Sequence, residues 1–410
     1  MWFYKKNTMS FLFCAVVLSG ALVAAAGVLA GAVNPYYLFY GNKWDIGMDF
    51  FNPVYSALSG TATLYPPLPM AFYNAIGLCF PPEIWQGGAA ALRASWQGTG
   101  LYVLYQIAGI CLFCALVLGI KKGEKTERAL FLTAVLFSAP FLFQFERANF
   151  IFPVLLLILG FLRWKDSPRP WVRHLALICL AAAGASKIYP LALGVILVRE
   201  KRWKDILLLG VYTAALLLLP SFLYGGPEAV YNRLWRNMQL HLNYLRRFGG
   251  FGYEVSAPNT FMLVSYWLGK PVSLAGIHAV SYSVLGVGAL AAWFSKKAWR
   301  AWALAGCLMA LVPQMSGFYS LILLFPAFVL LVDEADRKSP LDWFCFALFL
   351  IIWLPVWLFA LPKSWYAGNV ALFGETLVCR FAVLVLFAVL CAAGLVDAAR
   401  RVLAWGCQKG

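Results

Sequence analysis

Apolar runs of about 20 residues, separated by short polar segments, dominate the chain from end to end, and this is the length an α-helix needs to cross a bilayer. The ten-residue alternation of a transmembrane β-barrel is not seen. The pattern predicts an all-α polytopic membrane protein, one domain over residues 1–410, with about twelve transmembrane helices. The expected spans are residues 11–33, 100–120, 129–145, 150–162, 174–186, 188–198, 206–224, 272–294, 301–315, 318–332, 343–362 and 376–396.

Several of these runs are short, notably residues 150–162 and 188–198. We expect them to form broken or tightly turned helix pairs. Such breaks survive at membrane depth only where protein or water satisfies the freed backbone groups.

The first apolar run, residues 11–33, resembles a signal peptide but is too long for a cleaved hydrophobic region. We interpret it as a retained first span. Small residues at Ala24–Ala26 leave cleavage open as an alternative.

The charge distribution predicts the orientation. Of the 410 residues 62% are hydrophobic and only 12% are charged, and the net charge is +16. The basic residues form clusters between apolar runs, which argues against nucleic acid as a partner. Two thirds of the 33 Lys and Arg residues fall on alternate connections and the two termini. The positive-inside rule makes that face cytoplasmic and predicts a multi-pass protein of the plasma (inner) membrane with both termini inside.

Cysteine and histidine residues do not predict a metal site. The ten cysteines lie almost entirely inside apolar runs, where Cys111 and Cys114 behave as small hydrophobic residues. The three histidines lack metal-ligand spacing.

Two outer connections are long, residues 34–99 and 225–271. Leu, Trp and Tyr recur at helical spacing in LWRNMQLHLNYL of the second connection. We expect helices that lie on or dip into the outer interface.

Ionisable residues at the outer mouths of spans are candidates for function, because charge at such depth is costly. The outer acids are Asp45, Asp49, Glu83, Glu146, Glu228, Glu254 and Glu375. The outer bases include Lys43, Arg93, Arg147, Lys187, Arg233, Arg236, Arg246 and Arg247.

Asp49 begins an apparent helix, DFFNPVYSALSG, after Gly47. It either caps that helix and offsets its dipole or serves as a general base. Asp45 has ordinary interface neighbours, Lys43 and Trp44, and is a secondary candidate, as are Arg246 and Arg247.

Two outer cations have open interpretations. Lys187 precedes Tyr189–Pro190, where proline breaks the helix. It is either a snorkelling lysine at a helix end or a cation for a phosphate group. Glu146–Arg147 is either a local ion pair or part of a site.

These residues together resemble a GT-C glycosyltransferase, most closely glycosyltransferase family 87, which includes polyprenyl-phosphate-mannose-dependent mannosyltransferases. Two departures from the family pattern are Tyr319, where members often carry a histidine, and Glu146-Arg147-Ala148 in place of a Gly-Gln-like element. The resemblance rests on Asp49-Phe50, Tyr55, Ala57, Gly60, Leu64–Leu68, Arg147–Asn149, Lys187–Leu191, Asn259, Pro313–Ser316 and Tyr319.

The resemblance implies a GT-C-type bundle with an extracytoplasmic active site. It implies inverting transfer of a hexose or pentose, mannose above all, from a polyprenyl phosphate to a glycolipid or glycan acceptor. Asp49 would be the catalytic base, and no metal or cofactor would be required. The partners would be membrane lipids, the donor and the acceptor. Donor-phosphate or substrate contacts would come from Lys187, Arg147, Tyr65, Asn149, Asn259 and Tyr319.

Two other functions remain open from the sequence. Twelve spans with broken helices also suit a transporter or flippase of lipid-linked sugars, although the charges gather at one face rather than at the midplane. A non-catalytic subunit of an envelope-glycan assembly complex is the third hypothesis.

Overall fold

The computed structural model describes residues 8–31, 46–60, 64–248, 254–334, 336, 338–355, 365–367, 370–372 and 374–407. Nearly all of these residues are helical, which confirms the all-α class. The longer helices are α1 (Thr8–Leu29), α6 (Trp96–Ile120), α7 (Lys125–Leu136), α8 (Ala139–Arg147), α9 (Ile151–Trp164), α10 (Pro170–Ser186), α12 (Trp203–Leu218), α13 (Pro227–Phe248), α14 (Ala257–Trp267), α15 (Leu274–Phe294), α16 (Ala298–Leu311), α17 (Phe325–Glu334), α18 (Pro340–Trp353) and α20 (Gly374–Cys407).

Shorter elements fill the connections. They are α2 (Met48–Ser59), α3 (Pro67–Gly77), α4 (Pro82–Trp85), α5 (Gly88–Ala94), α11 (Gly194–Arg199), and the 3₁₀ helices η3 (Tyr189–Leu193), η4 (Leu219–Tyr224) and η6 (Phe318–Leu324). One antiparallel hairpin, not expected from the sequence, pairs β1 (Trp365–Ala367) with β2 (Val370–Leu372), and Tyr366 lies opposite Ala371.

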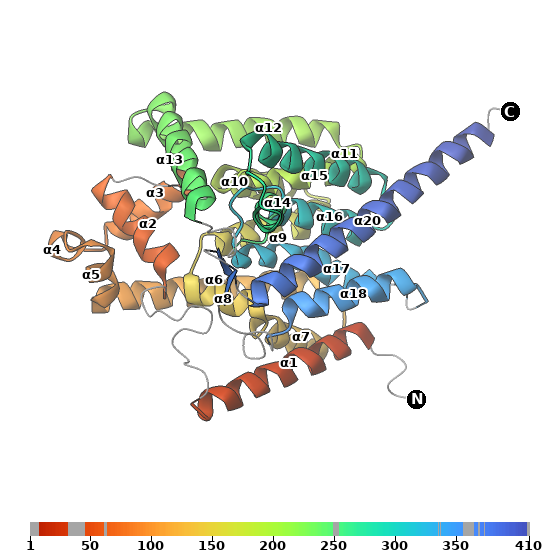
Figure 1. Ribbon diagram of the computed structural model, residues 1–410, viewed down its shortest axis with the longest axis horizontal. Helices are drawn as coiled ribbons and strands as arrows, with labels where there is room; N and C mark the ends of the chain where they lie inside the picture. The colour runs from red at the N-terminus through yellow and green to blue at the C-terminus, as the bar shows by residue number, and fades with distance from the viewer. Residues whose placement is uncertain are drawn as a thin grey trace.

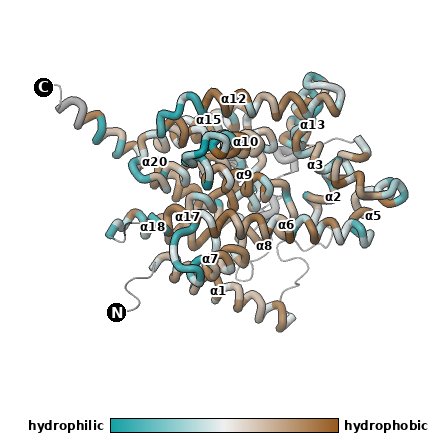
Figure 2. Tube along the Cα trace, turned by 180° about the vertical axis from the view of Figure 1, so that it is seen from behind, coloured by the Kyte–Doolittle hydropathy of each residue, from teal (hydrophilic) through white to brown (hydrophobic). Residues whose placement is uncertain are grey.

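The long helices α1, α6, α12 and α20 run along the length of the molecule (Figure 1). Helices α2, α4 and α5 lie at one end, and the start of α1 and the end of α20 lie at the other. Figure 2 shows apolar residues along the helices and hydrophilic residues gathered toward the two ends. This is the distribution of a multi-pass membrane protein.

In the described part of the chain, five helical segments are long and apolar enough to cross a membrane alone. They are Thr8–Leu29, Trp96–Ile120, Trp203–Tyr224, Leu274–Phe294 and Thr376–Leu403. The expected span 129–145 is a pair, α7 and α8, bent by 58°. The expected break between residues 174–186 and 188–198 is confirmed, because α10 ends at Ser186 and η3 begins at Tyr189.

Other apolar runs in the described residues form helices of 10–17 residues, namely Ile151–Trp164, Tyr189–Arg199, Ala298–Leu311 and Pro340–Trp353. Some of these are buried in the interior of the protein. In α16 nearly every residue from Trp299 to Leu311 is buried. A helix that is apolar on all sides is typical of a protein core as well as of a membrane span, so hydropathy alone does not separate the two.

An aromatic cluster joins these interior helices to their neighbours. The ring of Phe328 contacts those of Phe13, Phe131 and Trp353 at centroid distances of 4.7, 5.8 and 5.7 Å. These contacts hold α1, α7, α17 and α18 together. Edge-to-face and offset ring pairs of this kind add about 0.5–1.5 kcal/mol each beyond simple burial.

The long outer connections contain helices, as predicted: α2 to α5 within residues 34–99, and α13 and α14 within residues 225–271. That they lie at a membrane interface stays a prediction.

The end of the molecule opposite α2 is closed by ion pairs between helix ends. Lys121, just after α6, bonds Asp333 at 2.6 Å and Glu127 at 3.2 Å, and its side chain is almost fully buried. The pair joins the end of α6 to α17 and to α7. Removal of one partner from a buried ion pair leaves an uncompensated charge in the interior, which is strongly destabilising.

We therefore expect Lys121→Met to lower the free energy of unfolding by about 3 kcal/mol, because it leaves Asp333 buried and unpaired. Denaturation of the purified protein in detergent measures the change, and the double variant Lys121→Met/Asp333→Asn should recover part of it. Asp166, whose side chain is 71% exposed in its pair with Lys165, supplies the control: Asp166→Asn should cost less than about 1 kcal/mol. Equal losses in the two single variants would contradict the prediction.

Candidate active site

Asp49 lies in the first turn of α2, and the start of α2 rests on the end of α8. Gly47 precedes the helix with φ +62°, in the left-handed region. Its N–H donates to the carbonyl oxygen of Glu146 at 2.7 Å. A side chain at position 47 would meet the rings of Phe51 and Tyr102 at 2.9 and 3.1 Å. The glycine thus allows the close approach that brings Asp49 to α8.

The carboxylate of Asp49 is held by two residues of the α8–α9 junction. Arg147 donates from Nη2 to Oδ1 at 2.7 Å and from Nε to Oδ2 at 3.1 Å. Asn149 donates from Nδ2 to Oδ2 at 2.9 Å. The Oδ1 atom of Asn149 in turn accepts the Ile151 N–H at 3.0 Å, at the start of α9. Three predicted residues thus meet in one hydrogen-bonded group.

This geometry changes the interpretation of Asp49 and Arg147. Asp49 still lies near the positive end of α2, but the hydrogen bonds to its oxygens come from α8 and the junction after it. Arg147 of α8 forms a bidentate ion pair with Asp49 of α2, and this geometry orients the carboxylate. Oδ1 accepts only one of these bonds, so a second lone pair can receive a proton. Both side chains are partly exposed, at 17% for Asp49 and 13% for Arg147.

Lys187 occupies the break between α10 and η3. Its Nζ lies 4.4 Å from the centroid of the Tyr65 ring, a cation–π contact. Within the described ranges, no carboxylate lies at ion-pair distance from this nitrogen. Burial lowers the pKa of Lys187 to about 8, and the negative charges of Asp49 and Glu254 oppose that shift. The predicted residues Tyr65 and Lys187 are therefore in direct contact, close to Asp49.

Glu254 is a residue of this cluster that the sequence did not single out, beyond its place among the outer acids. Burial raises the pKa of its carboxyl group to about 7. The Ser316 N–H and the charges of Arg380 and Lys187 counteract that rise. Only the tertiary contact with residues 316–317 brings Glu254 here, so no local pattern could have identified it.

The other predicted residues have distinct positions. Tyr319, at the start of η6, stacks on Phe143 at a ring-centroid distance of 6.0 Å. The negative charges of Asp49 and Glu254 act on its hydroxyl group. Asn259 is fully buried in α14, and its Nδ2 donates to Ser256 Oγ and to the Gln314 carbonyl oxygen. Asn259 thus ties α14 to the segment before η6.

Three secondary candidates cannot be placed. Asp45 lies outside the described residues, and so do the side chains of Arg246 and Arg247 at the end of α13.

Among the residues that are described, no group of three or more His, Cys, Asp or Glu side chains has the arrangement of a metal site.

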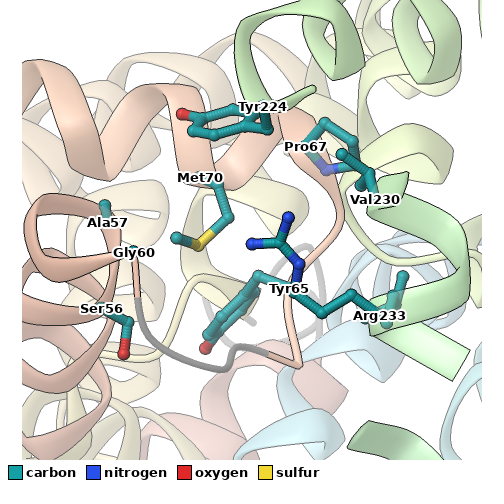
Figure 3. A pocket seen from close by; sticks show the side chains of 10 residues that line it. Ser56, Ala57, Gly60, Tyr65, Pro67, Met70, Tyr224, Val230 and Arg233 are labelled. Atoms are coloured by element: carbon teal, nitrogen blue, oxygen red, sulfur yellow. The ribbon is translucent and has the colours of Figure 1, made fainter. Parts of the chain in front are cut away.

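A pocket that is partly open to solvent lies beside Tyr65. Its walls come from α2, α3, η4 and α13 and are mostly apolar, and Figure 3 shows the Arg233 guanidinium turned toward Met70 and Tyr65. Tyr65 thus borders the pocket and also contacts Lys187. The lining residues are Ser56, Ala57, Gly60, Tyr65, Pro67, Met70, Tyr224, Val230, Arg233 and Leu234.

The comparison with protein families identifies the chain. The sequence model of glycosyltransferase family 87 matches residues 64–313, more than half of the chain. The protein belongs to glycosyltransferase family 87. It is therefore a membrane glycosyltransferase. A search of curated proteins and a search of solved structures gave no significant match.

The family match covers part of the site. Residues 64–313 include Tyr65, Arg147, Asn149, Lys187 and Glu254. Asp49 and Tyr319 lie outside the matched range, so their roles rest on the geometry and on the resemblance of the first outer loop. In this glycosyltransferase, Arg147 and Asn149 lie in the matched region, and both donate hydrogen bonds to Asp49, which precedes that region in the chain.

The glycine before Asp49 offers a test of this geometry. We expect Gly47→Ala to lower the free energy of unfolding by about 2–3 kcal/mol, because it adds contact with two rings to the strain of a left-handed alanine. Transfer should slow with it, since Asp49 lies two residues away.

Gly60, at the other end of α2, is the matched control. It has φ +67° with nothing within 4 Å of an added Cβ, so Gly60→Ala should cost only about 1 kcal/mol. Denaturation in detergent compares the two variants. Equal costs would mean that the ring contacts at Gly47 do not matter.

Proposed function

We propose that the protein transfers a hexose or pentose, with mannose the first sugar to test, from a polyprenyl phosphate to a glycolipid or glycan acceptor. Transfer takes place at the outer face of the membrane with inversion at the anomeric carbon. One observation carries the proposal: an oriented carboxylate, Asp49, interacts electrostatically with a cation, Lys187, that has no carboxylate at ion-pair distance among the described residues. The basic clusters at the opposite end support the outer location.

The donor fits the surroundings of Lys187. A polyprenyl phosphate joins an anionic headgroup to a long apolar chain. Lys187 would bind the phosphate as a compact point charge. The apolar pocket beside Tyr65 would receive the first isoprene units, and Arg233 adds a second positive charge there.

The reaction follows from these positions. Asp49 takes the proton from the acceptor hydroxyl group, and the hydroxyl oxygen forms a bond to the anomeric carbon. The bond from that carbon to the phosphate oxygen breaks, and its electron pair leaves with the polyprenyl phosphate. Lys187 stabilises the added negative charge, as preorganised groups do in a transition state. Asp49 then releases its proton to water.

No cofactor enters this scheme. The donor is already activated, because its phosphate leaves as a stable anion without a strong general acid. The partners are the lipid-linked donor, the acceptor and the surrounding membrane lipids.

The role of Asp49 predicts that Asp49→Asn lowers kcat by at least about 100-fold, the contribution of a positioned general base. Transfer from a polyprenyl-phosphate sugar by the purified protein measures it. The exposed outer acid Glu228 is the control, and Glu228→Gln should leave the rate unchanged. Undiminished transfer by Asp49→Asn protein that folds normally would remove Asp49 from the mechanism.

The role of Lys187 predicts that Lys187→Met weakens donor use by about 2–3 kcal/mol, the scale of a lost charge-assisted contact. Lys187→Arg should recover only part of this, because a planar guanidinium does not occupy the same point. The measured quantity is kcat/KM for the donor. Wild-type values in Lys187→Met would favour the snorkelling interpretation.

The same residue predicts a pH dependence. Burial lowers the pKa of Lys187 to about 8, against the negative charges of Asp49 and Glu254, which act to raise it. As pH rises through 8 the ammonium group loses its proton and the donor loses its cation, so kcat/KM should fall. Lys187→Arg should lack this falling limb, because a guanidinium stays charged. An identical profile in the two proteins would assign the limb to another group.

A further inference from the structure

Glu254 is fixed by its main chain at the edge of the site. It forms an antiparallel bridge with Gly317, and the Val255 N–H donates to the Ser316 carbonyl oxygen at 2.8 Å. From the other side, the buried guanidinium of Arg380 in α20 donates to the carbonyl oxygen of Glu254. The bridge and the Arg380 contact together hold the backbone of Glu254 in place.

The carboxyl group of Glu254 is buried, and it interacts electrostatically with residues already assigned to the site. Its charge acts on Lys187, Tyr189 and Tyr319, and the charge of Asp49 acts on it. Oε2 is covered by protein and has no hydrogen-bond partner among the described residues. A covered acceptor of this kind costs about 1–3 kcal/mol unless something donates to it. The carboxylate therefore has a buried acceptor that no described residue uses.

Lys187 has the complementary property. Its Nζ lies over the Tyr65 ring and has no carboxylate at ion-pair distance in the part of the chain that is described. Lys187 and Glu254 feel each other's charge but do not form an ion pair. Because the two groups are not paired with each other, the ammonium group can bind a negative group and the Glu254 carboxyl group can accept a hydrogen bond.

A sugar phosphate carries both groups in one molecule. The phosphate is bonded directly to the anomeric carbon, so the ring hydroxyl groups lie within a few bonds of it. A site that holds the phosphate on a cation needs acceptors for those hydroxyl groups nearby. We propose that Glu254 is a substrate-contacting residue that accepts a hydrogen bond from a hydroxyl group of the transferred sugar. This inference rests on the proposed function, and it assigns the choice of sugar to Glu254.

A purely structural role for Glu254 makes a different prediction. In that case the side chain only balances the charge of Arg380, and its removal would weaken the use of every donor by the same factor. If Glu254 instead bonds one hydroxyl group, removing either Glu254 or that hydroxyl group removes the whole contact. Removing the second partner then has no further effect. Removing both partners together therefore separates the two roles.

The experiment uses purified full-length protein, polyprenyl-phosphate mannose, and four donors in which the 2-, 3-, 4- or 6-hydroxyl group is replaced by hydrogen. The expected result is that wild-type protein uses one of the four with kcat/KM lowered about 10- to 100-fold, the range for a hydrogen bond to a charged group. For Glu254→Ala, kcat/KM with polyprenyl-phosphate mannose should be lowered by the same factor. With the sensitive deoxy donor, kcat/KM of this variant should fall little further. Glu254→Gln, which keeps a neutral acceptor, should fall between.

Two controls keep the outcomes distinct. Thermal unfolding of Glu254→Ala checks that the fold persists, and Glu83→Gln, at an exposed outer acid, should discriminate among the donors as wild type does. If Glu254→Ala lowers kcat/KM by one common factor for all five donors, Glu254 contacts no hydroxyl group and the inference is wrong. If wild-type protein transfers sugar from none of the polyprenyl phosphates, the proposed function fails first and the inference fails with it.

Discussion

The need to satisfy broken backbone in apolar surroundings organises this protein. An uninterrupted helix pairs its own N–H and C=O groups, but every break exposes some of them. Here breaks occur after α8, after α10 and before η6, and polar side chains occur at each. Asn149 bonds the start of α9, and Asn259 bonds the carbonyl oxygen of Gln314. The breaks lie close enough together for their polar groups to form one site.

The contact of Asp49 with Arg147 and Asn149 gives that site its chemistry. Arg147 balances the charge of Asp49, and both donors orient the carboxylate without occupying all of its lone pairs. Lys187 has a different environment, because its Nζ lies over the face of the Tyr65 ring. The result is an oriented carboxylate and, in the same cluster, a cation with no carboxylate at ion-pair distance among the described residues. This asymmetry is what suits the site to the donor we propose, whose leaving group is a phosphate.

Much of the candidate site was predictable as separate residues. Asp49, Arg147 and Lys187 stood out because charge beside apolar runs is costly, and the Lys187–Pro190 element indicated a break that the structure contains. Glu254 was visible only as one of seven outer acids. Its position depends on the bridge to Gly317, which joins two segments 63 positions apart in the numbering. A buried helix such as α16 has the same hydropathy as a lipid-facing one, so the sequence does not tell which apolar runs face lipid.

The sequence by itself determined the properties that depend on neighbouring residues: helical class, membrane insertion, the distribution of basic clusters and the places where helices break. Hydropathy and proline act locally, so they can be seen in a short window. The tertiary structure decided which polar groups meet. Asp49 and Arg147 are 98 positions apart, and Gly47 must pack against the end of α8 before their side chains can bond. Packing between distant helices sets that distance, and no local pattern encodes it.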